Sequence, residues 1–85
     1  MKKLIESKDE VFFTFEKRNK VKFLKQLKKY GCTWIDGRKI RPLLDNVRPP
    51  MSVKNNKLSV IPYFAAVPLS KRNNIKLIEF EDLGE

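Results

Sequence analysis

Residues 17–40, KRNKVKFLKQLKKYGCTWIDGRKI, contain the pattern that predicts the central helix and, through it, the fold. On an α-helix that advances about 100° per residue, an arc of roughly 120° collects four apolar side chains: Phe23, Leu24, Leu27 and Tyr30. This arc predicts an amphipathic helix over Lys17–Tyr30 whose apolar face packs on a sheet. Gly31 then supplies the left-handed conformation that commonly ends a helix.

Basic side chains fall on the opposite side of this expected helix. They are spaced four, three and four residues apart and are called the helix stripe here: Arg18, Lys22, Lys25 and Lys29. Side chains one helical turn apart lie about 5–6 Å from each other at Cβ, which is close to the spacing of phosphates along a nucleic-acid strand. The stripe therefore predicts an anion-binding face. The alternative is an ordinary solvated helix face.

A short hairpin is expected after the helix. Cys32–Ile35 and Arg38–Ile40 flank Asp36-Gly37, which is the preferred composition for a tight type I′ turn. Trp34 is expected to point inward and meet the apolar face of the helix. Three basic residues beside the turn would extend the anion-binding face: Arg38, Lys39 and Arg41. The alternatives are a loop, because each arm is short, and a solubilising turn that the neighbouring aspartate partly neutralises.

The flanking segments supply the remaining strands. Val11–Phe15 (VFFTF) and Ile75–Phe80 (IKLIEF) are short, apolar and β-rich, so each predicts a strand. Leu58–Val67 is a further β-rich run, and Pro62 inside it indicates an edge strand, a bulge or two short strands. Residues 41–56 hold three of the five prolines and are expected to form an irregular loop.

Together these elements predict a single small α+β domain over residues 1–85, in the order β-α-β-β-loop-β-β. One amphipathic basic helix would pack on a mainly antiparallel sheet of three to five short strands. A chain of 85 residues has room for one core. Strand order cannot be derived, because the long middle segment is left without an assignment. Residues 81–85 form an acidic tail.

Positive charge is concentrated in the same region as the helix and hairpin. Eleven basic residues and two acids lie between Lys17 and Arg48, so this segment carries the chain's whole net charge of +9. The rest of the chain is neutral overall. A charge of one sign gathered in one segment indicates a binding face for an anionic partner.

The composition favours binding over catalysis. Histidine is absent, which removes the usual participant in acid–base and zinc chemistry. The few acids, Asp36 and Asp45 among them, lack the convergent spacing of a magnesium-dependent nuclease site. We therefore predict no catalytic residue, metal ligand or cofactor, and a function that is not enzymatic. The single cysteine, Cys32, is expected to be a small buried residue in a reducing cytosol.

No stretch has the length of a signal-peptide core or of a membrane span, so a cytoplasmic protein without membrane contact is expected. The aromatic residues of the helix and hairpin fall at core positions. Tyr63 and Phe64, beside Pro62, are less constrained. They are candidates for stacking on bases or for contact with a protein partner.

The stretch Phe23–Lys39, FLKQLKKYGCTWIDGRK, resembles small uncharacterised proteins encoded by bacteriophages and prophages of low-GC bacteria. Those chains share an F-L-x-x-L helix followed by G-x-x-W-x-x-G-x-K. The matching positions are Phe23, Leu24, Leu27, Gly31, Trp34, Gly37 and Lys39. The resemblance implies a small helix-on-sheet fold and a phage context, hence the cytosol of a bacterial host. It implies no activity.

Two functional hypotheses remain open. In the first, the protein binds nucleic acid or a nucleoprotein through the helix stripe and the basic hairpin. In the second, it is a stoichiometric inhibitor or adaptor, anti-CRISPR-like, of a host or anti-phage defence protein. Its contact would then be the basic face on an acidic protein, or the expected edge strand Leu58–Val67 added to a partner's sheet. A virion-associated role is a third possibility. The sequence leaves the partner, DNA against RNA, and the oligomeric state undecided.

Overall fold

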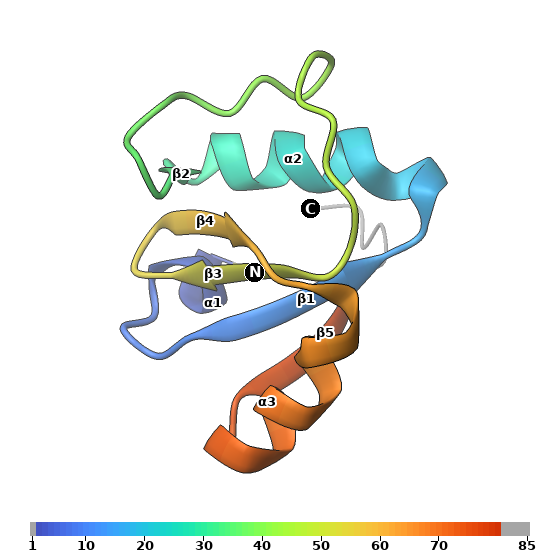
Figure 1. Ribbon diagram of the computed structural model, residues 1–85. Coiled ribbons are helices and arrows are strands. Elements are labelled where there is room, and N and C mark those ends of the chain that lie inside the picture. Colours follow the sequence, from blue (N-terminus) through green and yellow to red (C-terminus); the bar gives the residue numbers. More distant parts are fainter. Residues whose placement is uncertain (1, 81–85) are drawn as a thin grey trace.

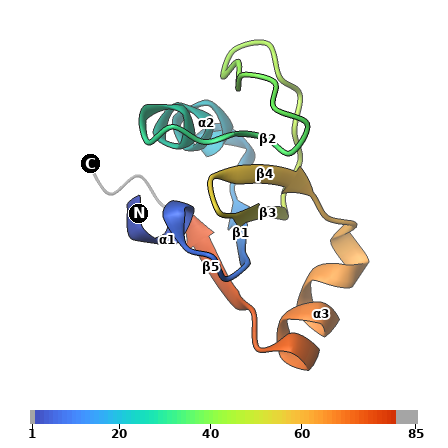
Figure 2. The same cartoon turned by 90° about the vertical axis from the view of Figure 1, so that its left-hand side faces the viewer.

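A computed structural model describes residues 2–80, apart from the side chains of Lys2 and Tyr63. Its helices and five strands form one α+β domain in which a sheet lies between helices on its two faces (Figures 1 and 2). In chain order the elements are α1 (Lys2–Glu6), β1 (Val11–Phe15), the 3₁₀ turn η1 (Lys17–Asn19), α2 (Lys20–Lys29), β2 (Thr33–Trp34), β3 (Met51–Lys54), β4 (Lys57–Val60), the 3₁₀ turn η2 (Tyr63–Ala65), α3 (Ala66–Asn73) and β5 (Lys76–Phe80).

The sheet is mixed, although the sequence predicted a mainly antiparallel one. The strand order is β2-β4-β3-β1-β5. Strand β3 runs antiparallel to β1 and β4, whereas the outer pairs β1–β5 and β2–β4 are parallel. Strands β4 and β5 therefore point the same way, and such strands need a crossover connection. Helix α3 supplies that crossover, and it was not expected from the sequence.

The main core lies between the sheet and the two helices α1 and α2. The apolar arc predicted for the helix is confirmed, since Phe23, Leu24 and Leu27 are fully buried. The Phe23 ring is surrounded by other aromatic rings, with centroids 5.4 Å from that of Phe13, 4.7 Å from that of Phe15 and 5.2 Å from that of Phe80.

The predicted end of the helix is confirmed as well. Gly31 follows α2 with φ of +81°, and the N–H of Cys32 then bonds to the carbonyl of Leu27. Trp34 and Tyr30 are half-buried and pack against the core, so they lie at its margin and not, as predicted, within it. The thiol of Cys32 is buried, as expected.

A second, smaller core lies on the other face of the sheet. Phe12, Ile61 and Ala66 are buried there beneath α3. The expectation that the β-rich run continues to Val67 and is followed by a turn is wrong, because a helix occupies this segment. Pro68 is the third residue of α3, where a backbone N–H has no partner within the helix, so the proline is tolerated. Asn74 closes the helix in the left-handed conformation, with φ of 54°.

The expectation of an irregular segment over residues 41–56 is corrected for its second part. Met51–Lys54 forms β3, which lies in the middle of the sheet between β4 and β1. Asn55 and Asn56 both have positive φ, 49° and 63°, and connect β3 to β4 as a two-residue hairpin loop. Asparagine tolerates this conformation, which type I′ turns require. Residues 41–50 contain no strand or helix.

The turn at Asp36-Gly37 differs in detail from the predicted two-residue turn. The N–H of Gly37 bonds to the carbonyl of Trp34 at 2.8 Å, and the N–H of Trp34 bonds to the carbonyl of Arg38 at 2.9 Å. Three residues therefore separate the arms, and Gly37 has φ of +90°. This is the longer hairpin form that needs glycine at its last loop position. Only a single bridge, Thr33 to Lys39, joins the arms, so the second arm is not a strand.

Candidate anion-binding surface

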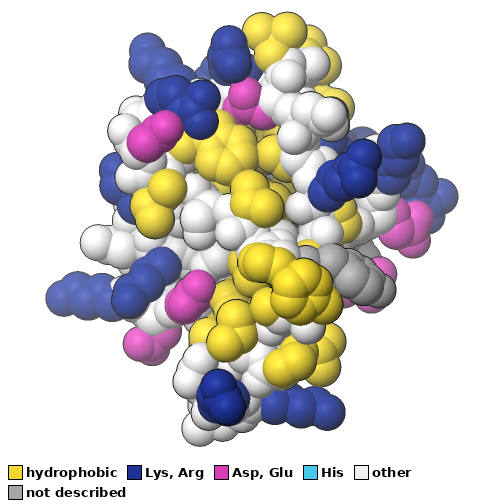
Figure 3. Space-filling view, viewed as in Figure 1, with side chains coloured by type: hydrophobic (Ala, Val, Ile, Leu, Met, Phe, Trp, Pro, Cys, Tyr) yellow, Lys and Arg dark blue, Asp and Glu magenta, His cyan; other side chains and the backbone are white. Residues whose placement is uncertain are grey.

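The helix stripe lies on the side of η1 and α2 that faces away from the sheet, and all four of its side chains are exposed. Lys and Arg side chains are most numerous around the half of the molecule that holds α2 and the segment after it (Figure 3). Within the stripe, Arg18 forms an ion pair with Glu16 at 2.7 Å. The Lys29 ammonium lies 5.5 Å from the ring centroid of Tyr30. Lys25 is exposed on the same side.

The hairpin cations gather around one hollow of about 430 Å³, which Arg38, Lys39 and Arg41 line together with Trp34 and Asp45. Both arginines have carboxylate neighbours. Arg38 Nε lies 2.7 Å from Asp36 Oδ2, and Arg41 Nη2 lies 3.4 Å from Asp45 Oδ1. The arginine side chains stay mostly exposed in these pairs, so each pair contributes little to stability and leaves the guanidinium accessible.

Asp45 holds the segment after the hairpin against the core. Its Oδ2 accepts the indole N–H of Trp34 at 2.9 Å and the backbone N–H of Arg41 at 2.8 Å. The bond from the Arg41 backbone is the largest cause that lowers the pKa of Asp45 below its ordinary value of 3.8. The Trp34 indole and the Arg41 guanidinium lower it further, against the opposing effect of burial. The pKa of Asp36 is lowered too, first by the backbone N–H of Arg38.

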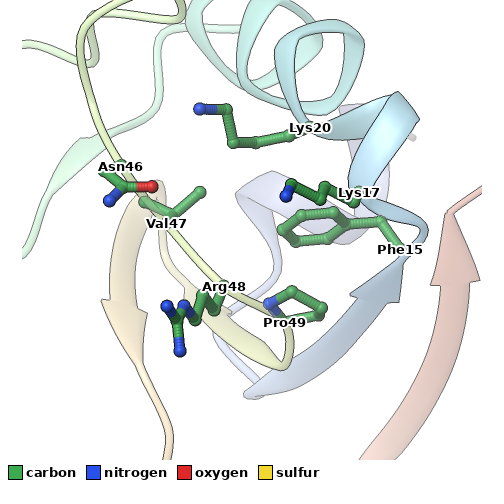
Figure 4. A pocket seen from close by; sticks show the side chains of 7 residues that line it. All are labelled: Phe15, Lys17, Lys20, Asn46, Val47, Arg48 and Pro49. Atoms are coloured by element: carbon green, nitrogen blue, oxygen red, sulfur yellow. The ribbon is translucent and has the colours of Figure 1, made fainter.

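A further group of cations meets at a place the sequence did not predict. A hollow of about 650 Å³, named here the basic pocket, lies between the start of the helical segment and residues 46–49 (Figure 4). It is lined by Phe15, Lys17, Lys20, Asn46, Val47, Arg48 and Pro49. One signal in the sequence points to it. Lys20 lies three, four and seven residues before Phe23, Leu24 and Leu27, so it falls within the apolar arc of the helix instead of the stripe. A lysine at a core-facing position is unusual.

The described residues contain neither a cluster of metal ligands nor an activated thiol. Among residues 2–80, no group of three or more His, Cys, Asp or Glu side chains is placed to hold a metal ion. Burial raises the pKa of the Cys32 thiol to about 11, so this side chain is protonated at neutral pH. No helix in the part of the chain described is long and apolar enough to cross a membrane.

An exposed apolar patch lies on the opposite side of the sheet, at the end of the molecule that holds α3 (Figure 3). Thr14, Pro50, Phe64, Ala66, Val67 and Leu77 line a shallow hollow there. Phe64 is 83% exposed, Val67 50% and Leu77 42%. Phe64 was a predicted contact residue and is accessible for that role. The side chain of Tyr63, predicted with it, lies outside what the structure describes, as does the acidic tail 81–85.

The predicted edge strand is corrected by the topology. Strand β4, which contains the first part of Leu58–Val67, lies between β2 and β3. The edges of the sheet are β2, which is only two residues long, and β5, which pairs on one side with β1. Within residues 2–80, β5 is the longer of the two edge strands, and its residue Leu77 lines the apolar patch.

Comparison of the chain with models of protein families, with curated proteins and with solved structures found no match. The resemblance to small phage proteins therefore stays a prediction.

Proposed function

We propose that this protein binds nucleic acid, or the nucleic-acid groove of a nucleoprotein, as a non-catalytic accessory protein. The observation that carries the proposal is the hollow beside the hairpin, where Arg38, Lys39 and Arg41 surround Trp34. The exposed cations of the helix stripe add to the same positive segment. The resemblance to small phage proteins adds a phage context and, with it, the cytosol of a bacterial host.

The arginine pairs of the hairpin are compatible with phosphate binding. A guanidinium binds phosphate through two parallel hydrogen bonds and can exchange an exposed carboxylate for such a ligand at small cost. Arg38 and Arg41 are 70% and 60% exposed, so a phosphate can approach both without unfolding the segment. The carboxylates of Asp36 and Asp45 keep the two side chains oriented in the absence of a ligand.

The test is a salt titration of binding to fluorescent duplex and single-stranded oligonucleotides. On duplex DNA the logarithm of the affinity should fall against the logarithm of salt concentration with a slope of about −0.9 per phosphate neutralised. Reversing two stripe charges, in Lys25→Glu with Lys29→Glu, should abolish binding while the circular dichroism spectrum stays native. The matched control reverses Lys71 and Arg72, two exposed residues at the end of α3.

Both double variants lower the net charge by the same amount, so their comparison separates a located site from general attraction. Equal losses in the stripe variant and the control would contradict the proposal, because the positive charge would then act only as a whole. Absence of binding by the wild-type protein at low salt would contradict it directly.

The apolar patch favours a second candidate function, that of a stoichiometric protein-binding inhibitor or adaptor. Monomeric proteins rarely leave a contiguous apolar surface uncovered when no partner uses it. Phe64→Ser would leave stability unchanged, since the ring is 83% exposed, and would weaken capture of a protein partner. A pull-down from bacterial lysate with and without nuclease distinguishes the two functions. A partner that persists after nuclease and is lost in Phe64→Ser favours the second, whereas material that disappears after nuclease favours the first.

A further inference from the structure

We propose that the basic pocket binds the phosphate group of a nucleotide, with the rest of the nucleotide resting on its apolar floor. This inference deepens the proposed function and takes from it only the class of ligand. The residues concerned, Lys17, Lys20, Asn46 and Arg48, are all different from those of the helix stripe and the hairpin.

The pocket is assembled from two distant parts of the chain. Phe15 ends β1, Lys17 begins η1 and Lys20 begins α2. The other lining residues come from residues 46–49, just before β3. Lys17 and Lys20 extend into the space from the helix side, Asn46 lies on the other side, and the Arg48 guanidinium lies at the outer rim, directed away from the two lysines (Figure 4). Among residues 2–80, the lining contains three cations and no carboxylate. Like charges gathered in this way repel one another unless an anion lies between them.

The cations of the pocket differ from the arginines of the predicted face in their partners. Arg18, Arg38 and Arg41 each have a carboxylate within 4 Å. No ion pair or side-chain hydrogen bond involves Lys17, Lys20 or Arg48 within residues 2–80. Glu16, the acid next to Lys17 in the sequence, forms an ion pair with Arg18 at 2.7 Å. Positive charge at the pocket is therefore available to a ligand.

The start of α2 adds to the positive character of the pocket. Helix N-termini carry partial positive charge and usually have acidic side chains in the first turn. Here the first turns of η1 and α2 have none, Glu16 directly precedes η1, and neither Glu16 nor Asn19 makes a side-chain capping bond. Lys20 is instead the first residue of the helix and is half-buried at its core-facing side. A lysine in this position is unfavourable for the isolated helix, and a bound anion would offset that cost.

The size and lining of the pocket indicate a nucleotide in preference to a bare phosphate ion. A hollow of about 650 Å³ lies within the range of about 300–1,000 Å³ typical of organic-ligand sites. Phe15, Val47 and Pro49 supply apolar surface that a sugar or base can cover, and the Asn46 amide can both donate and accept a hydrogen bond. The nucleotide can be the phosphorylated end of a strand or a free nucleotide, and the experiment distinguishes these sources.

The experiment compares four probes by fluorescence polarisation or calorimetry. They are a single-stranded oligonucleotide with a 5′-phosphate, the same oligonucleotide with a 5′-hydroxyl, a free nucleoside monophosphate, and inorganic phosphate. The pocket variants are Arg48→Gln, an exposed position, and Asn46→Asp, which is nearly isosteric and places a negative charge in the pocket. The matched control is Arg72→Gln on α3. Circular dichroism and thermal unfolding check that each variant is folded.

If the pocket binds the end of a strand, the 5′-phosphate raises the affinity of the wild-type protein about tenfold. This is the size expected for one added charge-assisted contact. Arg48→Gln and Asn46→Asp then remove that advantage and leave affinity for the 5′-hydroxyl probe near the wild-type value. If the source is a free nucleotide, the monophosphate binds alone, more tightly than inorganic phosphate, and the same two variants weaken it. Arg72→Gln changes every probe by less than twofold in both cases.

The pocket proposal is overturned if the 5′-phosphate has no effect and the monophosphate does not bind better than inorganic phosphate. It is also overturned if the pocket variants act no differently from Arg72→Gln. Failure of the proposed function looks different. In that case neither oligonucleotide binds the wild-type protein, while binding of the monophosphate still decides the pocket.

Discussion

Asp45 connects the hairpin to the segment that carries Arg48. Replacing Asp45 tests how much its hydrogen bonds contribute to the stability of the fold. Its side chain is only 10% exposed. Both of its shorter hydrogen bonds, from the Trp34 indole and the Arg41 backbone, end on the same oxygen, Oδ2. Asp45→Ala removes the acceptor of both hydrogen bonds at once, whereas Asp45→Asn can place its amide oxygen at the Oδ2 position and keep both bonds.

The expected loss of unfolding free energy depends on how far each of the two N–H donors is buried. In Asp45→Ala the half-buried Trp34 N–H loses a charged acceptor, and the exposed Arg41 N–H turns to water. The resulting loss of unfolding free energy is about 2 kcal/mol, which lowers the midpoint of thermal unfolding by about 8–16 °C in a domain of this size. Asp45→Asn loses the ion pair at 3.4 Å with the mostly exposed Arg41 guanidinium, a cost of about 0–1 kcal/mol.

Trp34 is the only tryptophan of the chain, so its fluorescence reports on this contact directly. Thermal unfolding followed by circular dichroism measures stability, and the emission spectrum at low temperature measures the surroundings of the indole. Asp45→Ala should shift the emission of the folded protein, and Asp45→Asn should not. Equal stabilities and spectra for the two variants would refute the reasoning, because the shared oxygen would then not matter.

Lowering the pH should reduce the contribution of Asp45 to the unfolding free energy. The pKa of Asp45 in the folded protein is below its ordinary value of 3.8. The carboxylate therefore stabilises the fold above that value, and the contribution is lost as pH falls through the lower folded pKa. The difference in stability between the wild type and Asp45→Asn should shrink over this acidic range. A difference that stays constant down to the acid end would contradict the assignment.

Two further predictions concern the residues after α2. Gly31→Ala should lower the unfolding free energy, measured in urea, by about 1–2 kcal/mol, because Gly31 has φ of +81° and this left-handed conformation is unfavourable for alanine. The added methyl group meets nothing within 4 Å, so no clash or new contact changes this value. Wild-type stability for this variant would show that the left-handed conformation is not required. The buried Cys32 thiol, with its pKa raised to about 11, should resist a thiol reagent at neutral pH in the folded protein and react at once in denaturant. Rapid stoichiometric labelling of the folded protein would contradict this.

Features encoded by local periodicity could be predicted from the sequence. The helix, its buried face of Phe23, Leu24 and Leu27, and its end at Gly31 depend on residues within a few positions of one another. The strand Val11–Phe15 was predicted with its observed bounds, and β5, Lys76–Phe80, lies within the predicted Ile75–Phe80, because short β-rich runs bounded by charged or polar residues are a local signal. The exposure of the helix stripe follows from the same period as the burial of the opposite face.

The predicted hairpin shows where local reasoning becomes uncertain. Asp36-Gly37 does mark a turn, yet the strand pairing around it extends over a single bridge, and the true two-residue turn is Asn55-Asn56. The segment AVPLSKRN is helical although it follows a β-rich run. Its Ala66 and Leu69 side chains pack with Phe12 and Ile61, which come from other elements, so the assembled sheet decides its conformation.

The sequence by itself determined one core helix, its polarity and the segment that carries the net charge, because helix periodicity and charge are local properties. Only the tertiary structure decided the parallel outer strands, the crossover by α3 and the central place of β3, because these depend on pairings between distant residues. The tertiary structure also decided which cations have no carboxylate partner among residues 2–80. Arg18, Arg38 and Arg41 form ion pairs with carboxylates close in sequence, whereas Lys17, Lys20 and Arg48 come to line one hollow only after the chain has folded.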